Sequence, residues 1–163
     1  MAWKYRVLVV ANVTATSDEL LERLVARSAH NACSFSLLVP ATGGGGAGRR
    51  AAAQKLTAAL ERLEAAGLEV DGRVGDADPV VAVHDVWDPM RWDEIVVSTL
   101  PTGASRWLQA DLPHRIEKLT DLPVRHVVAQ PPPKRPKPTP MPAHESYGIL
   151  TPLAALGSRG ARR

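Results

Sequence analysis

Five short apolar runs, rich in β-branched residues and separated by helical patterns, constrain the fold of this chain most. They cover residues 5–11, 34–39, 68–74, 94–98 and 124–129. Continuous apolar runs of this length are typical of strands buried on both faces, and their alternation with helices favours a parallel sheet. The sequence therefore predicts an α/β fold, with a doubly wound five-stranded parallel sheet of strand order 3-2-1-4-5. Asp71 and Gly72 interrupt the third run, which suits an edge strand.

Helical spacing of apolar residues predicts helices over 17–29, 50–66 and 79–87, and a broken helical segment over 105–119. A capping box of Thr16 and Glu19 is expected to start the first helix, and Asp78 followed by Pro79 is expected to start the third.

The glycine-rich stretch 43–48 precedes two arginines, but the Lys-Ser or Lys-Thr of a phosphate-binding loop is absent. We interpret the stretch as a flexible connection rather than a phosphate cradle.

The composition changes after residue 129. Seven prolines fall within residues 130–142, and residues 130–163 contain six basic residues and one acidic residue. We predict a folded domain over 1–129 and a basic, proline-rich, disordered tail over 130–163. The tail is either a solvated extension or a binding segment for a protein or polyanion. Because the whole chain carries a net charge of +3, residues 1–129 are slightly acidic. This argues against specific nucleic-acid binding by the domain.

The sequence indicates a cytoplasmic protein. Its single cysteine, Cys33, excludes an internal disulfide. No run of eighteen apolar residues is present and no signal-peptide cleavage pattern follows the N-terminal apolar run, so no membrane partner is expected. Candidate catalytic pairs such as Ser105 with His114 lack an orienting acid, and His84 with Asp88 lacks a third metal ligand. We expect neither an enzyme nor a metal site.

The loop after the fourth strand is the candidate binding site. In a parallel α/β sheet, the loop that leaves the carboxyl end of a central strand and enters a helix is the usual ligand position. This loop offers hydroxyl groups, a glycine and a guanidinium, which suit an anion. The alternative is that the serine caps a helix and the arginine is a surface charge. The candidate residues are Thr99, Thr102, Gly103, Ser105 and Arg106.

Three segments resemble the universal stress proteins, single-domain α/β modules of adenine-nucleotide-binding type. They are the turn 75–79 (GDADP), the strand 93–97 (DEIVV) and the ending 122–128 (LPVRHVV). The resemblance covers about residues 4–129. The stretches STLP, SRWL and DLPHR within residues 98–115 are similar to a divergent actinobacterial subset of the family. The resemblance implies the strand order given above and an adenine nucleotide, ATP or AMP, at the junction of strands one and four.

The phosphate-binding glycines of that family are absent here. Nucleotide-binding members carry two glycines separated by two residues after strand four and then, after nine intervening residues, a Gly-Ser or Gly-Thr at a helix start. Alignment places Ser98 and Pro101 at the first two positions and Asp111-Leu112 at the last. Proline has no amide to donate, and a carboxylate competes with phosphate for a helix N-terminus. Asn12 stands where the family has an acidic residue that serves the nucleotide sugar.

These observations favour a non-catalytic, stress-related scaffold or regulator in which ATP binding is lost or weakened and no cofactor is required. The alternative is a small-molecule sensor that binds an adenine nucleotide through Asn12, Val39 and the loop 99–106. A hydrolase on the same scaffold lacks an adequate set of residues. The exposed edge of the fifth strand, 124–129, predicts a homodimer.

Overall fold

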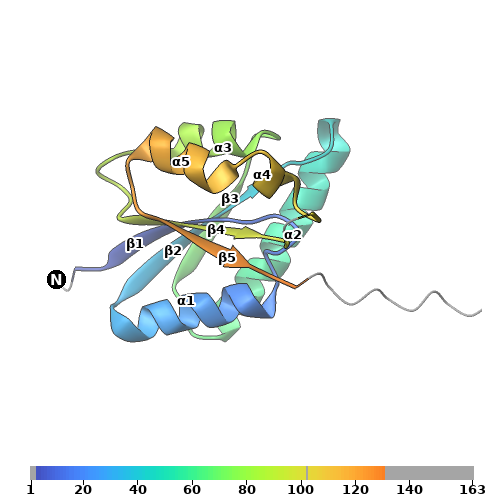
Figure 1. Ribbon diagram of the computed structural model, residues 1–163. Helices are drawn as coiled ribbons and strands as arrows, with labels where there is room; N and C mark the ends of the chain where they lie inside the picture. The colour runs from blue at the N-terminus through green and yellow to red at the C-terminus, as the bar shows by residue number, and fades with distance from the viewer. Residues whose placement is uncertain (1–2, 102, 131–163) are drawn as a thin grey trace, which may run out of the picture. The chain divides into compact units, whose positions relative to one another are not determined.

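The computed structural model describes residues 3–101 and 103–130. These residues form a five-stranded parallel sheet in the order β3-β2-β1-β4-β5, which confirms the predicted topology (Figure 1). The third run lies at one edge of the sheet, as expected, and the fifth at the other. The strands are β1 (Tyr5–Val10), β2 (Cys33–Pro40), β3 (Val70–Gly75), β4 (Glu94–Thr99) and β5 (Val124–Val128).

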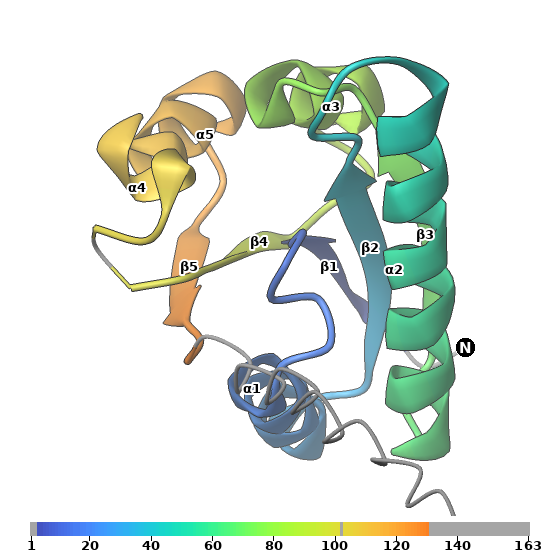
Figure 2. The same cartoon turned by 90° about the vertical axis from the view of Figure 1, so that its right-hand side faces the viewer.

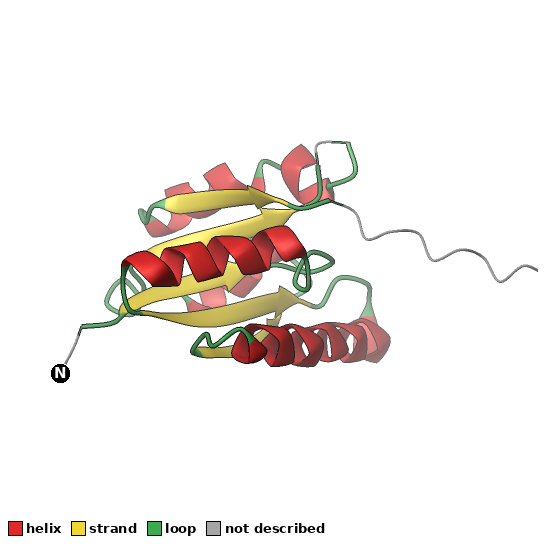
Figure 3. Ribbon diagram, turned by 90° about the horizontal axis from the view of Figure 1, so that it is seen from below, coloured by secondary structure: helices red, strands yellow, loops and turns green. Residues whose placement is uncertain are grey.

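Helices cover both faces of the sheet. They are α1 (Asp18–His30), α2 (Gly45–Ala65), α3 (Pro79–Val86), α4 (Arg106–Gln109) and α5 (Leu112–Thr120). Figures 1 and 2 show α3 and α5 on one face, and Figure 3 shows α1 and α2 in front of the other. The predicted break in the last helical segment is confirmed by the separate helices α4 and α5.

Alternate side chains of each central strand enter two separate cores. In β1, Val7 and Val9 pack with the α1 and α2 residues, whereas Leu8 and Val10 pack with the α3 and α5 residues. All four side chains are 0–2% exposed. Strands buried in this way must be apolar on both faces, which explains why the runs in the sequence are continuous rather than alternating.

The first helix begins differently from the prediction. Ser17, rather than Thr16, is the N-cap, and its hydroxyl accepts a hydrogen bond from the Leu20 amide at 3.2 Å. Glu19 does not close a capping box, because its carboxylate accepts from the Gln130 amide at 3.0 Å. The predicted start of α3 is confirmed: the Asp78 carboxylate accepts from the Val80 amide at 2.8 Å.

The glycine-rich stretch belongs partly to α2, which begins at Gly45 rather than near residue 50. Gly43 and Gly45 have φ of 95° and 72°, a backbone region that favours glycine. A Cβ at Gly48 would lie 1.7 Å from the Gly43 carbonyl oxygen. The prediction of a connection up to residue 49 is therefore wrong, because the glycines allow a tight turn that packs against the first turn of α2.

The predicted tail, 130–163, lies outside the described residues except for Gln130. Within residues 3–101 and 103–130, no helix has the length and apolar character needed to cross a membrane.

Candidate functional site

A pocket of about 260 Å³ lies where β1 and β4 end. These neighbouring strands are followed by chains that lead to opposite faces of the sheet, so a crevice forms between their carboxyl ends. The turn after β2 and the first turn of α4 complete its wall. The lining residues are Asn12, Val13, Thr14, Thr42, Ser98, Thr99, Leu100, Ala104, Ser105, Arg106 and Trp107.

Asn12 is held by three hydrogen bonds inside the protein. Its side-chain amide donates to the Pro40 carbonyl at 2.7 Å and to the Thr42 hydroxyl at 2.8 Å. Its carbonyl oxygen accepts from the Lys55 ammonium at 2.7 Å. Both amide hydrogens are therefore used, and only one oxygen lone pair is left for a ligand. Asn12 mainly fixes the turn after β2 and holds the positive charge of Lys55 beside the pocket.

Ser98 places an unpaired hydroxyl at the pocket. Its side chain is 1% exposed, and its Oγ has no hydrogen-bond partner among the described residues. Its backbone carbonyl, by contrast, accepts from the Thr14 hydroxyl at 3.1 Å. Trp87 Nε1 is the other buried polar side-chain atom without a partner in the described part of the chain, and it does not line this pocket. A buried hydroxyl without a partner is unfavourable, so a ligand that hydrogen-bonds Ser98 would gain binding free energy.

The loop after β4 uses its own backbone donors. The Pro101 carbonyl accepts hydrogen bonds from the amides of Ala104 at 3.0 Å and Ser105 at 3.2 Å. The Ser105 hydroxyl accepts from the Leu108 amide at 3.3 Å and caps α4. Gly103 has φ of 96°, which closes this turn. Three backbone amides of this segment are thus already hydrogen-bonded within the protein.

The start of α5, the helix that follows α4, is unfavourable for an anion as well. Asp111 occupies the N-cap position of α5 with φ of 50°, and its side chain makes no capping hydrogen bond. A carboxylate at this position opposes the attraction of a helix N-terminus for phosphate.

Thr99 is tied to the edge strand. Its hydroxyl donates to the Leu100 carbonyl at 3.0 Å and lies 2.7 Å from His126 Nε2. Because a hydroxyl has one hydrogen to donate, this arrangement makes His126 Nε2 the donor to Thr99. Burial lowers the pKa of His126, which favours the neutral imidazole.

The structure brings together four of the predicted site residues: Asn12, Thr99, Ser105 and Arg106 all line the pocket. Val39 is fully buried in the core on the α1 and α2 side, so its side chain does not reach the pocket. Gly103 is exposed in the loop and does not line it. Thr102 lies outside the described residues.

Sequence reasoning missed the walls contributed by Thr14 and Thr42. Thr14 follows β1 and Thr42 follows β2, so both lie at the carboxyl edge of the sheet, where parallel strands end together. That shared position was the available signal. No group of three His, Cys, Asp or Glu residues that could hold a metal occurs within the described ranges.

Comparison with known proteins gives a fold. No family model matches the chain, and no curated protein matches it. Among solved structures, a universal stress protein in complex with cAMP is 20% identical, with a TM-score of 0.56 over 79% of this chain and 99% of that chain. The universal stress protein from Archaeoglobus fulgidus in complex with dAMP is 13% identical, with a TM-score of 0.58 over 78% and 99%. A further structure of an Archaeoglobus fulgidus universal stress protein is 14% identical, with a TM-score of 0.58 over 76% and 93%. This chain therefore has the fold of the universal stress proteins.

Proposed function

We propose that this protein is a divergent universal-stress-type regulator of the cytoplasm that catalyses no reaction and binds nucleoside triphosphates weakly. The observation that carries the proposal is the use of backbone donors within the loop 99–105. The amides of Ala104 and Ser105 bind the Pro101 carbonyl, and Pro101 itself has no amide. A triphosphate would have to break these hydrogen bonds before it could form its own.

The charges around the site support the same proposal. Lys55 and Arg106 are the cations beside the pocket, but Lys55 is held by Asn12. Arg106 is exposed, so its attraction for a phosphate is screened by water and salt. The start of α5 carries the Asp111 carboxylate and does not line the pocket, so it adds no positive charge for a triphosphate.

Calorimetric titration with ATP tests this proposal. We expect a dissociation constant in the millimolar range or weaker, and no release of phosphate over the same period. ATP binding in the micromolar range would contradict weakened binding, and steady turnover would contradict the non-catalytic assignment.

A sensor of a nucleotide with one phosphate is the second candidate, and the unpaired hydroxyl of Ser98 favours it. The pocket has about 260 Å³ and an apolar wall from Val13, Leu100 and Trp107, and such walls suit a base or a sugar ring. Two of the solved universal stress proteins contain cAMP and dAMP, each with a single phosphate. A ligand of this kind would need fewer loop amides than ATP.

The substitution Ser98→Ala separates the two candidates. Removing a buried hydroxyl without a partner should raise the free energy of unfolding of the ligand-free protein by about 1 kcal/mol. If AMP is the ligand, the same change should weaken AMP binding roughly fivefold or more, because one hydrogen bond is lost. Val81→Ala, which shortens an exposed residue of α3 that does not line this pocket, is the matched control. No AMP binding to the unsubstituted protein at millimolar concentration would eliminate the sensor.

We further propose that the protein acts as a homodimer through β5. In the described part of the chain, the free side of β5 is paired with no other strand. An unpaired strand edge offers backbone donors and acceptors to a second copy of the same edge.

A further inference from the structure

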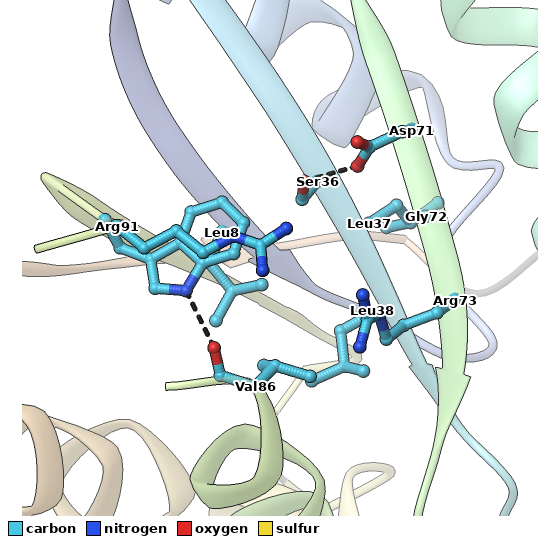
Figure 4. A pocket seen from close by; sticks show the side chains of 10 residues that line it. Leu8, Ser36, Leu37, Leu38, Asp71, Gly72, Arg73, Val86 and Arg91 are labelled. Atoms are coloured by element: carbon cyan, nitrogen blue, oxygen red, sulfur yellow. Dashed lines mark hydrogen bonds between the residues drawn. The ribbon is translucent and has the colours of Figure 1, made fainter. Parts of the chain in front are cut away.

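A second pocket lies on the α3 side of the sheet, away from the loop after β4. It has a volume of about 130 Å³ and shares no lining residue with the pocket at the ends of β1 and β4. Figure 4 shows Arg73 and Arg91 entering it from opposite sides, with both guanidinium groups directed inward. Arg73 comes from β3, and Arg91 comes from the segment before β4.

The two guanidinium groups have no acid partner among the described residues. No ion pair forms between either arginine and a carboxylate there. The one carboxylate in the pocket, that of Asp71, already accepts a hydrogen bond from the Ser36 hydroxyl. Asp76 and Asp85 line a neighbouring hollow with Arg73, without an ion pair to it. The pocket thus concentrates two positive charges against one negative charge that is already hydrogen-bonded.

The floor of the pocket is apolar and rigid. Leu8 and Leu38 are 2% and 1% exposed and belong to the core beneath it. The Trp92 indole is fixed by a 3.0 Å hydrogen bond to the Val86 carbonyl, and the Arg91 guanidinium lies 5.1 Å from the centre of its ring. Both arginines are exposed, so water and salt screen part of their charge, but a stacked guanidinium presents its planar edge to an acceptor.

We propose that this pocket binds a small organic carboxylate. Its charged group would lie between Arg73 and Arg91, and its alkyl part would cover Leu8, Leu38 and Trp92. A planar guanidinium group can form two parallel hydrogen bonds with a carboxylate. Inorganic phosphate has no alkyl group that could pack against the apolar floor. The volume is well above the ~10–15 Å³ that one water requires, but it admits only a short chain.

The test is a titration of the full chain followed by backbone amide NMR, with butyrate as the probe. Inorganic phosphate is a control ligand that has the negative charge but no alkyl group. Butyramide is a control ligand that has the alkyl group but no charge. We expect butyrate to shift amide signals of β3 and of residues 90–92, phosphate to bind more weakly, and butyramide not to bind. Phosphate binding more tightly than butyrate, or shifts confined to residues 98–107, would overturn the proposal.

Four variants locate the site. Arg73→Gln and Arg91→Gln should each weaken butyrate binding about tenfold, because each removes a charged hydrogen bond. Asp71→Asn keeps an acceptor for Ser36 but removes the negative charge, so binding should tighten severalfold. Arg115→Gln removes an exposed charge from α5 and should change the affinity less than twofold. Equal effects of the Arg73, Arg91 and Arg115 substitutions would mean nonspecific charge attraction and would overturn the assignment.

Discussion

Glu94 is a buried carboxylate at the start of β4, on which two arginines converge. Its side chain is 5% exposed, with Oε2 at 3.0 Å from Arg27 Nε and Oε1 at 3.5 Å from Arg125 Nε. Burial acts to lower the pKa of Arg27, but the hydrogen bond and negative charge of Glu94 outweigh it, and the pKa is raised. Arg27 also lies over the Tyr5 ring at 4.3 Å. Glu94 thus joins α1, β4 and β5 at one end of the sheet.

Replacing Glu94 by glutamine should destabilise the domain. Glutamine preserves the shape but leaves the partly buried Arg27 without a counter-charge. Removing one partner of a fully buried ion pair lowers the free energy of unfolding by about 3–5 kcal/mol. Both arginines here are partly exposed, so we expect a smaller decrease of about 1–3 kcal/mol. Urea denaturation measures it. Glu69→Gln, which removes the partner of Lys4 in an exposed pair, should change stability by less than ~0.5 kcal/mol. Equal effects of the two substitutions would show that the Glu94 cluster contributes nothing.

His126 should make stability depend on pH. Burial lowers its pKa in the folded protein below the ordinary value of 6.5. As the pH falls below about 6.5, the unfolded chain takes up a proton at this position before the folded chain does, so the free energy of unfolding decreases. The contribution of neutral His126 is fully present above that pH.

The comparison of the unsubstituted protein with His126→Gln isolates this residue, because the other histidines are common to both. We expect the midpoint of thermal unfolding to vary less with pH in the variant between about pH 5 and 7, a range that spans the ordinary histidine pKa and the region below it. A variant with the same pH dependence as the unsubstituted protein would contradict the role of His126.

At the scale of single elements, the start of α2 depends on one glycine and not on its neighbour. A Cβ at Gly48 would meet the Gly43 carbonyl oxygen, whereas a Cβ at Gly46 would meet nothing within 4 Å. Gly48→Ala must therefore displace the turn before the helix, and should cost about 1–3 kcal/mol. Gly46→Ala should be neutral or stabilise by up to ~1 kcal/mol, because alanine is the better helix former.

The same pair of variants connects α2 to the candidate site. The turn that Gly48→Ala would displace begins at Thr42, whose hydroxyl accepts from Asn12. Thermal denaturation measures the stability change, and NMR signals of Asn12 and Thr42 should move in Gly48→Ala but not in Gly46→Ala. If both substitutions raise stability, the tight turn seen here is not required for folding.

The elements were predictable where one strong local signal determined them. Continuous apolar runs placed the central strands, the run interrupted by Asp71 and Gly72 placed β3 at an edge, and Asp78 with Pro79 placed the start of α3. The start of α2 was missed because glycine is a poor helix former, and sequence alone does not show that a close approach to residue 43 requires it. The cap of α1 was displaced by one residue because Thr16 and Ser17 carry equivalent hydroxyl groups.

The candidate site was predictable in position but not in chemistry. The end of a central parallel strand and the absence of the family's glycines are both visible in the sequence. The hydrogen bond from Lys55 to Asn12 joins residues that are 43 positions apart. The hydrogen bonds from two amides to the Pro101 carbonyl depend on the conformation of the loop. Hydrogen bonds of this kind determine which polar groups remain available to a ligand. They cannot be predicted from local sequence patterns.

At the scale of the whole molecule, the two edges of the sheet differ. One face of β3 packs against α2, since a Cβ at Gly72 would lie 2.6 Å from a Leu56 methyl carbon, and Figure 2 shows α2 running along this strand, whose Asp71 and Arg73 are exposed and charged. The β5 edge carries Val128, which is 46% exposed. Exposed apolar strand edges favour pairing with another strand, so β5 is the edge at which a second copy would add to the sheet.

The substitution Val128→Pro tests this dimer without breaking the sheet. Ala129 donates its amide to the Thr99 carbonyl at 2.8 Å, and in a strand alternate amides point to opposite sides. The Val128 amide therefore faces the free edge, where proline removes a donor needed by the second copy but none needed by β4. We expect light scattering to give twice the 17.5 kDa chain mass for the unsubstituted protein and for Val128→Ala, and a single chain mass for Val128→Pro. A mass of one chain for the unsubstituted protein at high concentration would eliminate the dimer. A dimer that survives Val128→Pro would assign its interface to another surface.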